Sequence, residues 1–417
     1  MNSEKTILRK NSKKEKKLKI KETIIGFALA LASCGNEGPD LSEQNLRAVG
    51  FGSYTEQFQT RGGEEATLTR GEVKRAIPDG GSMGVYAYYH DGSRWATDEE
   101  NNQPNFMWNQ QCTYNGVYDA FVYAPLKYWP NEENDKLSFI AYYPFTNTES
   151  MEGPESPAST GLTPLLTNSG KGLPSFEFTV KENAEDQVDL LVSNLIIDLP
   201  KTRDTEGDPG TPFNDLSIYD KVKFLFHHAL SKVEFRVVAD AEIRKDIVKF
   251  KLNSLNITNI HKTGTLTTSY DEGDTKLDWG SYSAMHGTAP ANELSFKTYV
   301  PQLLVPQKLH PQTNEDMTKA MLNLDYEITF KSDGTTYKYD DGTSTWEAKE
   351  DYTYKNEASL QLNTLKVTGT DTPLTEWLPH HHYIYTIRLR ANRIEFTGEV
   401  VEWGATIPVS DIEIKEN

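Results

Sequence analysis

Alternation of apolar and polar residues with a period of two is the feature that most restricts the fold of this sequence. Successive side chains of a β-strand point to opposite faces of the sheet, so this period is typical of half-buried strands. Clear examples are VYAYY (Val85 to Tyr89), LSFIAYY (Leu137 to Tyr143), KVEFRVV (Lys232 to Val238) and YIYTIRL (Tyr383 to Leu389). Turn clusters such as PDGG at Pro78 to Gly81 separate the stretches. The chain is therefore predicted to be all-β.

The length of 417 residues allows about two or three domains. A run of Gly, Pro and charged residues, TRDTEGDPGTP at Thr202 to Pro212, separates two strand-rich halves of similar size. We expect a domain boundary in this run, with one β-domain at residues 47–210 and another at 211–417.

Charge is distributed unevenly along the chain. Nine of the 43 Lys and Arg residues lie in the first 21 positions, whereas only three of the 61 Asp and Glu residues precede Cys34. From Cys34 onward the net charge is therefore 34 minus 58, or −24. Such an acidic surface repels phosphate backbones, which disfavours a nucleic-acid partner.

The first 33 residues have the three parts of a secretory signal: a basic segment, the apolar run Ile24 to Ala32 and small residues before Cys34. The apolar run is too short to cross a bilayer. Leu31-Ala32-Ser33-Cys34 resembles the lipobox of bacterial lipoproteins, in which the cysteine becomes the lipid-bearing N-terminus. The resemblance implies a signal peptide at 1–33, lipidation of Cys34, a tether at 34–46 and anchoring in the outer membrane. The alternative is a small buried cysteine that closes a core helix.

The second cysteine, Cys112, has no partner once Cys34 is acylated. A disulfide framework and a cysteine-based zinc site are therefore excluded. The fold must depend on a buried β-core.

Two patterns resemble a catalytic motif and a metal site, but a structural interpretation is favoured for both. Gly80-Gly81-Ser82-Met83-Gly84 matches the nucleophile motif G-x-S-x-G, but a strand follows the serine where that motif needs a helix. His227-His228 and His380-His381-His382 could begin a zinc site, yet no third ligand can be named. No carboxylate pair can be singled out as an acid/base couple. The sequence therefore predicts no catalytic residue, no metal and no cofactor.

Several stretches resemble the fimbrillin family of type V pilus subunits and their Mfa-like relatives, in the expected order. The first is PNFMWNQQCTYNGVYDAFVYAPLKYWPNEENDKLSFIAYYPF, Pro104 to Phe145, and the later ones are DLLVS (Asp189 to Ser193), FHHALSKVEF (Phe226 to Phe235), HHYIYTIRL and GEVVEW (Gly398 to Trp403). Within the first stretch, Pro125 and Pro130 frame the pair Tyr128-Trp129, for which packing is favoured over binding.

This resemblance implies two consecutive transthyretin-like β-sandwich domains and a subunit that polymerises by strand exchange. An Arg-specific protease removes the first strand of the lipidated precursor, and a strand of the next subunit fills the groove. Leu46 to Thr60 is the candidate leaving strand, followed by Arg61 in a Gly-rich stretch that suits proteolysis. Arg70 and Arg75 are alternative cleavage sites. The partners implied are other fimbrial subunits, the protease and the outer membrane.

The C-terminal segment has two interpretations. Its apolar residues Ile407, Val409, Ile412 and Ile414 could dock into the groove of a neighbouring subunit as a donor strand. It could instead form the last strand of the second domain, with Pro408 at an edge or bulge. The donor interpretation is slightly favoured.

The sequence thus predicts a structural or accessory subunit of a cell-surface fimbria, without enzymatic activity. The main alternative is a monomeric surface lipoprotein whose β-sandwiches bind a glycan or a host ligand. A β-sandwich hydrolase ranks last because no convergent acid/base set is visible.

Overall fold

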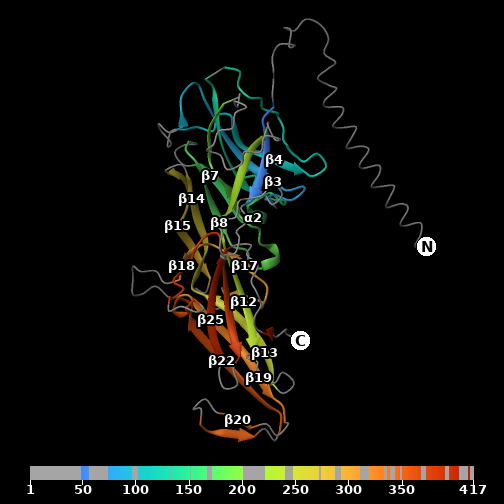
Figure 1. Ribbon diagram of the computed structural model, residues 1–417, viewed down its shortest axis with the longest axis vertical. Coiled ribbons are helices and arrows are strands. Elements are labelled where there is room, and N and C mark those ends of the chain that lie inside the picture. The colour runs from blue at the N-terminus through green and yellow to red at the C-terminus, as the bar shows by residue number, and fades with distance from the viewer. Residues whose placement is uncertain are drawn as a thin grey trace, which may run out of the picture. The chain divides into compact units, whose positions relative to one another are not determined.

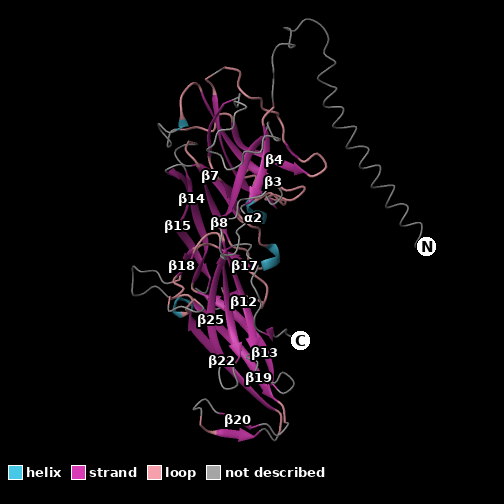
Figure 2. Ribbon diagram, in the orientation of Figure 1, coloured by secondary structure: helices cyan, strands magenta, loops and turns pink. Residues whose placement is uncertain are grey.

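Four β-sheets and two short two-stranded sheets contain nearly all regular structure in the described part of the chain (Figures 1 and 2). The structure is a computed structural model. It describes residues 48–413 except for 56–73, 96–101, 133, 151, 167–170, 201–220, 240–247, 272–273, 287–292, 310–318, 333–335, 339–342, 348–349, 368–371, 390–393 and 403–411. Within these residues, no helix has the length and apolar character needed to cross a membrane.

The first sheet has nine strands, eight of them in the order β2-β1-β11-β9-β6-β3-β4-β5, with β10 paired to β6. The strands are β1 (Gly50–Thr55), β2 (Lys74–Arg75), β3 (Ser82–His90), β4 (Met107–Asn115), β5 (Ala120–Val122), β6 (Lys136–Tyr143), β9 (Leu191–Ser193), β10 (Ile196–Pro200) and β11 (Lys221–His228). Between β6 and β7 lies the short helix α2 (Pro157–Thr160), which Ser156 caps at its N-terminus.

Three further sheets have the orders β15-β14-β8-β7, β17-β12-β24-β25 with β26 beside β12, and β16-β13-β19-β22. Their strands are β7 (Leu162–Leu166), β8 (Pro174–Thr179), β12 (Ser231–Ala239), β13 (Val248–Thr258), β14 (Ile260–Asp271), β15 (Asp274–His286), β16 (Leu294–Ser295), β17 (Gln302–Leu304), β19 (Met321–Phe330), β22 (Tyr352–Gln361), β24 (His381–Leu389), β25 (Ile394–Glu402) and β26 (Ile412–Glu413). The short sheets pair β18 (Gln307–Lys308) with β23 (Glu376–Trp377) and β20 (Thr336–Lys338) with β21 (Thr345–Glu347). The 3₁₀ turns are η4 (Ala184–Asp186) and η6 (Leu362–Thr364).

All four alternating stretches of the sequence form strands, namely β3, β6, β12 and β24. The all-β prediction is therefore confirmed. In β3, Met83 and Val85 pack into one apolar cluster, whereas Tyr86 and Tyr88 pack into the other. Because both faces of this strand are covered, nearly all of its side chains are buried.

The first sheet takes strands from both sides of residues 202–212, which lie outside the described residues. The strand β11 follows them in sequence, yet it pairs with β1 and β9 of the first sheet. Likewise, β14 pairs with β8, although nearly ninety residues separate them. A division of the chain at residue 210 does not follow this pairing, and the two-domain arrangement stays a prediction.

Candidate functional site

The first strand, β1, lies between two segments of the chain that are both distant from it in sequence. Its residues Gly50 to Thr55 pair in parallel with Lys221 to Phe226 of β11. On its other edge, the Val49 amide donates to the Lys127 carbonyl at 2.9 Å, and Ala48 forms a bridge with Tyr128. Its last two residues pair with the short strand β2. Backbone hydrogen bonds therefore hold β1 along both edges, and we call this place the β1 slot.

The inward face of β1 carries Val49, Phe51 and Ser53, all of which are buried. The Phe51 ring lies 5.6 Å from the rings of Tyr123 and Phe224 and 6.0 Å from that of Phe139, measured between ring centroids. These three rings form an aromatic pocket, and Phe51 fills it. Burying a phenylalanine side chain stabilises a fold by about 1.5 to 3 kcal/mol, so Phe51 is the main anchor of β1.

Tyr123 adds a polar contact to the same pocket. Its hydroxyl donates to the Val49 carbonyl at 2.7 Å and lies 3.3 Å from the Lys127 carbonyl. Burial raises the pKa of Tyr123 to about 12, against a smaller opposing effect of the bond to Lys127. The hydroxyl therefore stays protonated at neutral pH and remains a donor to β1.

The predicted leaving strand, Leu46 to Thr60, is thus paired within the first sheet over residues 50–55, and Ala48 forms an isolated bridge with Tyr128. Of the predicted cleavage sites, Arg61 and Arg70 lie outside the described residues, as does Cys34. Arg75 lies in β2 rather than in a loop, and the amide of the next residue, Ala76, donates to the Ser53 carbonyl. A protease needs a mobile substrate, so the pairing of β2 disfavours cleavage after Arg75.

Of the predicted donor residues, only Ile412 lies within the described residues. It forms β26 with Glu413 and pairs antiparallel with Ala239 at the end of β12. Ile407, Val409 and Ile414 lie outside the described residues. In the isolated chain, two residues of the C-terminal segment therefore pair within the same molecule.

The five predicted histidines gather near the start of β12 and β24. The ring centroid of His380 lies 5.5 Å from that of His228 and 6.4 Å from that of His227. The Nδ1 atom of His228 lies 2.5 Å from a carboxylate oxygen of Asp189. Among the described residues, no three His, Cys, Asp or Glu side chains are arranged to hold a metal ion.

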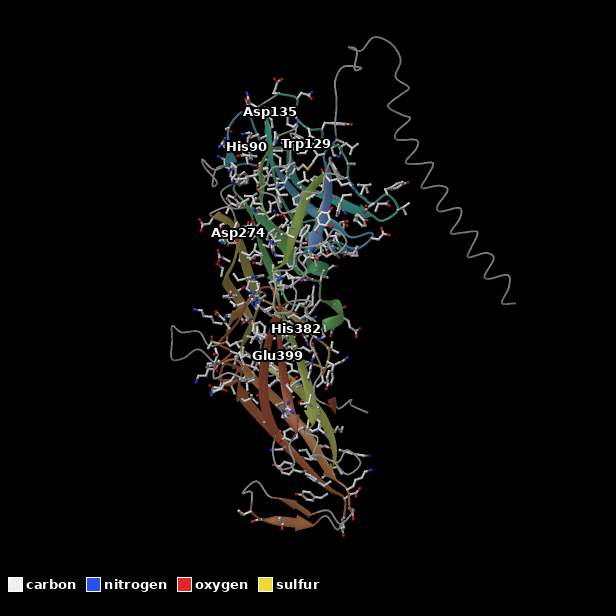
Figure 3. All side chains as sticks on the ribbon, in the orientation of Figure 1. His90, Trp129, Asp135, Asp274, His382 and Glu399 are labelled. Carbon is white, nitrogen blue, oxygen red and sulfur yellow. The ribbon has the colours of Figure 1, made fainter. Side chains whose placement is uncertain are left out.

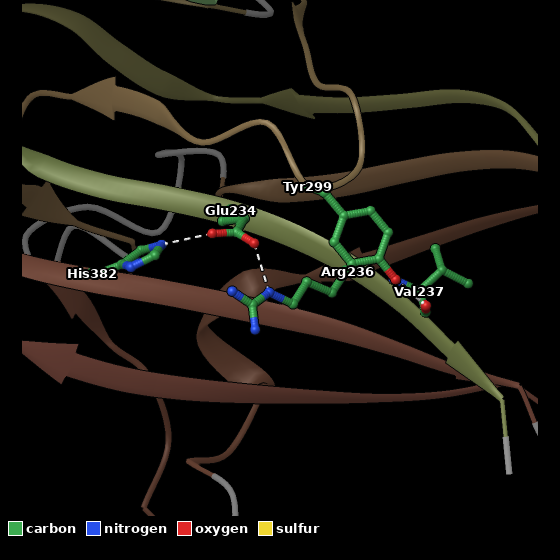
Figure 4. A network of polar contacts seen from close by, with 5 residues as sticks. All are labelled: Glu234, Arg236, Val237, Tyr299 and His382. Atoms are coloured by element: carbon green, nitrogen blue, oxygen red, sulfur yellow. Dashed lines mark hydrogen bonds and ion pairs between the residues drawn. The ribbon is translucent and has the colours of Figure 1, made fainter. Parts of the chain in front are cut away.

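His382 belongs to a separate buried polar network, shown in Figure 4. Its Nε2 atom lies 3.1 Å from one carboxylate oxygen of Glu234, and Arg236 Nε donates to the other at 2.6 Å. Burial by itself raises the pKa of Glu234, but the hydrogen bonds and charges of His382 and Arg236 lower it to about 2. Nearby, the Tyr299 hydroxyl donates to the Val237 carbonyl. This network joins β12 to β24.

We expect acid to destabilise the protein from about pH 6.5 downward. Burial, with the charges of His228, His227 and His381, lowers the pKa of His380 from 6.5 to about 4. A lowered histidine pKa means that the fold prefers the neutral ring, so its contribution is complete above pH 6.5 and is lost as pH falls toward 4. The contribution of the Glu234 carboxylate is lost below pH 4.5, toward pH 2.

The variant His380→Asn tests this expectation, since asparagine does not titrate and tolerates the left-handed backbone of His380, with φ of 64°. Urea midpoints at pH 7 and pH 4.5 should differ less in the variant than in the parent chain. Equal pH dependence of the two proteins would contradict the role of His380.

The remaining motif residues pack as ordinary parts of the sheet. Ser82 begins β3 and hydrogen-bonds Thr113, so a strand follows this serine where the nucleophile motif needs a helix. Trp129, labelled in Figure 3, is buried against Phe139, which agrees with the packing role. Tyr128 is partly exposed and borders the β1 slot instead.

Sequence reasoning did not find the residues that flank β1. Lys127, Tyr123 and β11 lie between about 70 and 170 positions away from it, and the alternation that reveals a strand does not name its partner. The stretches singled out by resemblance contain Tyr123 and Lys127, in Pro104 to Phe145, and the end of β11, in Phe226 to Phe235, but they do not indicate that these residues flank β1.

Comparison with known proteins identifies the class to which this β-protein belongs. Residues 69–403, more than half of the chain, match the family model described as fimbrillin-like, and the chain belongs to this family. Its sequence is 26% identical over 415 residues to that of the fimbrium subunit Fim1C of Phocaeicola vulgatus. The alignment covers 93% of this chain and 97% of that protein. A solved structure of a fimbrial protein from Bacteroides vulgatus has a TM-score of 0.52 at 19% identity, covering 86% of this chain and 99% of that one. That likeness supports the fold.

Proposed function

We propose that this protein is a structural or accessory subunit of a cell-surface fimbria that polymerises by strand exchange. Family membership and the similarity to a fimbrium subunit support the assembly role. The observation that carries the mechanism is the β1 slot. Within the described residues, β1 is held there by backbone hydrogen bonds and by side chains such as Phe51.

The covalent connection of β1 to the rest of the protein runs through residues 56–73, which include Arg61 and Arg70. A cut after either arginine would leave β1 attached by non-covalent contacts alone. Its departure would expose the aromatic pocket of Tyr123, Phe139 and Phe224 and the backbone edge of β11. An extended segment of another subunit restores both kinds of contact, which supplies the driving force for polymerisation.

The proposed donor is the C-terminal segment with Ile407, Val409, Ile412 and Ile414. In the polymer it leaves its own molecule and enters the β1 slot of the neighbour. Within the part of the chain that the structure describes, the pairing that this change must break is that of Ile412–Glu413 with Val238 and Ala239 of β12.

One polymerisation experiment tests the proposal. The full chain is treated with an Arg-specific protease, its new N-terminus is sequenced, and polymers are sought on gels without boiling. We expect a single cut after Arg61 or Arg70 followed by a ladder of polymers. A chain lacking Val409 to Asn417 should be cut equally but stay monomeric.

Matched controls separate the steps. A double variant Arg61→Gln and Arg70→Gln should be neither cut in this segment nor polymerised. Cut protein that stays monomeric would contradict strand exchange and favour a monomeric ligand-binding lipoprotein. Normal ladders from the truncated chain would exclude the C-terminal segment as donor.

A further inference from the structure

Ser53 is an unusual residue for the centre of a buried strand face. It lies two positions after Phe51 on the inward face of β1 and opposite Phe224 of β11, with an exposed fraction of 4%. Its Oγ atom has no hydrogen-bond partner in the part of the chain that the structure describes. A buried hydroxyl without a partner has given up its hydrogen bonds to water without replacement, which destabilises the state that buries it.

Four other buried serines of the described residues are hydrogen-bonded, namely Ser138, Ser156, Ser193 and Ser231. Ser138 Oγ accepts from the Asp198 amide at 3.1 Å, and Ser231 Oγ donates to the Leu378 carbonyl at 2.8 Å. Ser193 Oγ both accepts from the Ala141 amide and donates to the Asn194 carbonyl, each at 2.9 Å. The unsatisfied hydroxyl is thus a particular feature of β1 and not a general property of the buried serines in this fold.

The outward positions of β1 add to this weakness. Gly50 and Gly52 flank Phe51 and have no side chain of their own, and the ring of Tyr54 covers Gly52. Glycine also loses more conformational freedom than other residues when a strand becomes ordered. One strong anchor, Phe51, is therefore combined with three residues that hold the strand poorly.

We propose that Ser53 sets how readily β1 leaves its slot, and that the slot prefers an incoming strand with an apolar side chain two residues after the one in the Phe51 pocket. The occupant that fits is an extended segment of a second copy of this chain. Ile407 with Val409, and Ile412 with Ile414, are apolar pairs with this spacing. This inference rests on the proposed function, because β1 leaves only if strands exchange.

The uncut chain tests the weakness of Ser53 without any polymerisation. Ser53→Ala removes the unsatisfied hydroxyl, so its urea midpoint should be higher than that of the parent chain. The matched control Ser193→Ala removes a hydroxyl with two partners, and its midpoint should be lower. An unchanged or lower midpoint for Ser53→Ala would overturn the inference.

The rate at which the N-terminal fragment with β1 leaves the cut protein is a second test of the role of Ser53. The parent chain and Ser53→Ala are cut with the Arg-specific protease, and loss of the N-terminal fragment is followed by size-exclusion chromatography in the presence of excess synthetic peptide LRAVGFGSYTEQFQT. The fragment should leave the variant about tenfold more slowly, since one unsatisfied hydroxyl corresponds to a factor of that order. Equal or faster release from the variant would overturn the inference.

The two assays distinguish the possible failures. If the cut parent chain never releases its fragment or takes up the peptide, the proposed function fails. The urea midpoints of the uncut proteins still decide whether Ser53 weakens β1.

Discussion

Replacing Cys34 with serine is expected to abolish lipidation and release the protein from the outer membrane. The thiol is the only group at this position that can carry the diacylglycerol, and a serine hydroxyl is far less nucleophilic. Several acyl chains bind a bilayer firmly, at about 0.8 kcal/mol per buried CH₂, whereas the short apolar run Ile24 to Ala32 cannot cross it. The measurement is incorporation of labelled fatty acid together with flotation of membranes.

The chain offers a matched control in its other cysteine. Cys112 lies on β4, is fully buried and has no disulfide partner, and burial raises the pKa of its thiol. Its thiol is therefore unreactive, and Cys112→Ser should be lipidated like the parent chain. Labelled and floating Cys34→Ser protein would refute the lipoprotein assignment of this cysteine.

Local patterns revealed the strands of this fold but not their partners. The alternation in VYAYY and YIYTIRL reports which side chains share a face, and β3 and β24 form there. Nothing in β1 or β11 indicates that they pair in parallel across about 170 residues, since register between strands depends on how the whole core is filled. The slot was therefore invisible in the sequence, and the prediction that Leu46 to Thr60 leaves as a strand came from the family resemblance alone.

Local patterns also do not show the surroundings of single residues in the folded chain. Arg75 was predicted as an alternative cleavage site, yet Lys74–Arg75 pair with Tyr54 and Thr55 of β1, and Ile77, two residues later, is buried. The burial of Ser53 opposite Phe224, without a hydrogen-bond partner among the described residues, is likewise visible only in the structure.

Replacing Phe51 with alanine is expected to have the largest effect on stability of any single change in β1. It empties the aromatic pocket formed by Tyr123, Phe139 and Phe224, and removal of a buried phenylalanine ring costs about 3 to 5 kcal/mol. Among the buried residues of β1, which are Phe51, Gly52 and Ser53, Phe51 is the one with a large apolar side chain. After proteolysis, the N-terminal fragment of Phe51→Ala should separate from the protein without added peptide.

Urea unfolding of the uncut chain measures the first effect, and size-exclusion chromatography of the cut chain measures the second. Tyr354→Ala is the matched control, because this aromatic side chain on β22 is 43% exposed and its loss should change stability by less than about 0.5 kcal/mol. A fragment of Phe51→Ala that stays bound after the cut would show that the backbone hydrogen bonds to β11 and Lys127 hold β1 by themselves. In that case, an incoming strand would not need a side chain that fills the aromatic pocket.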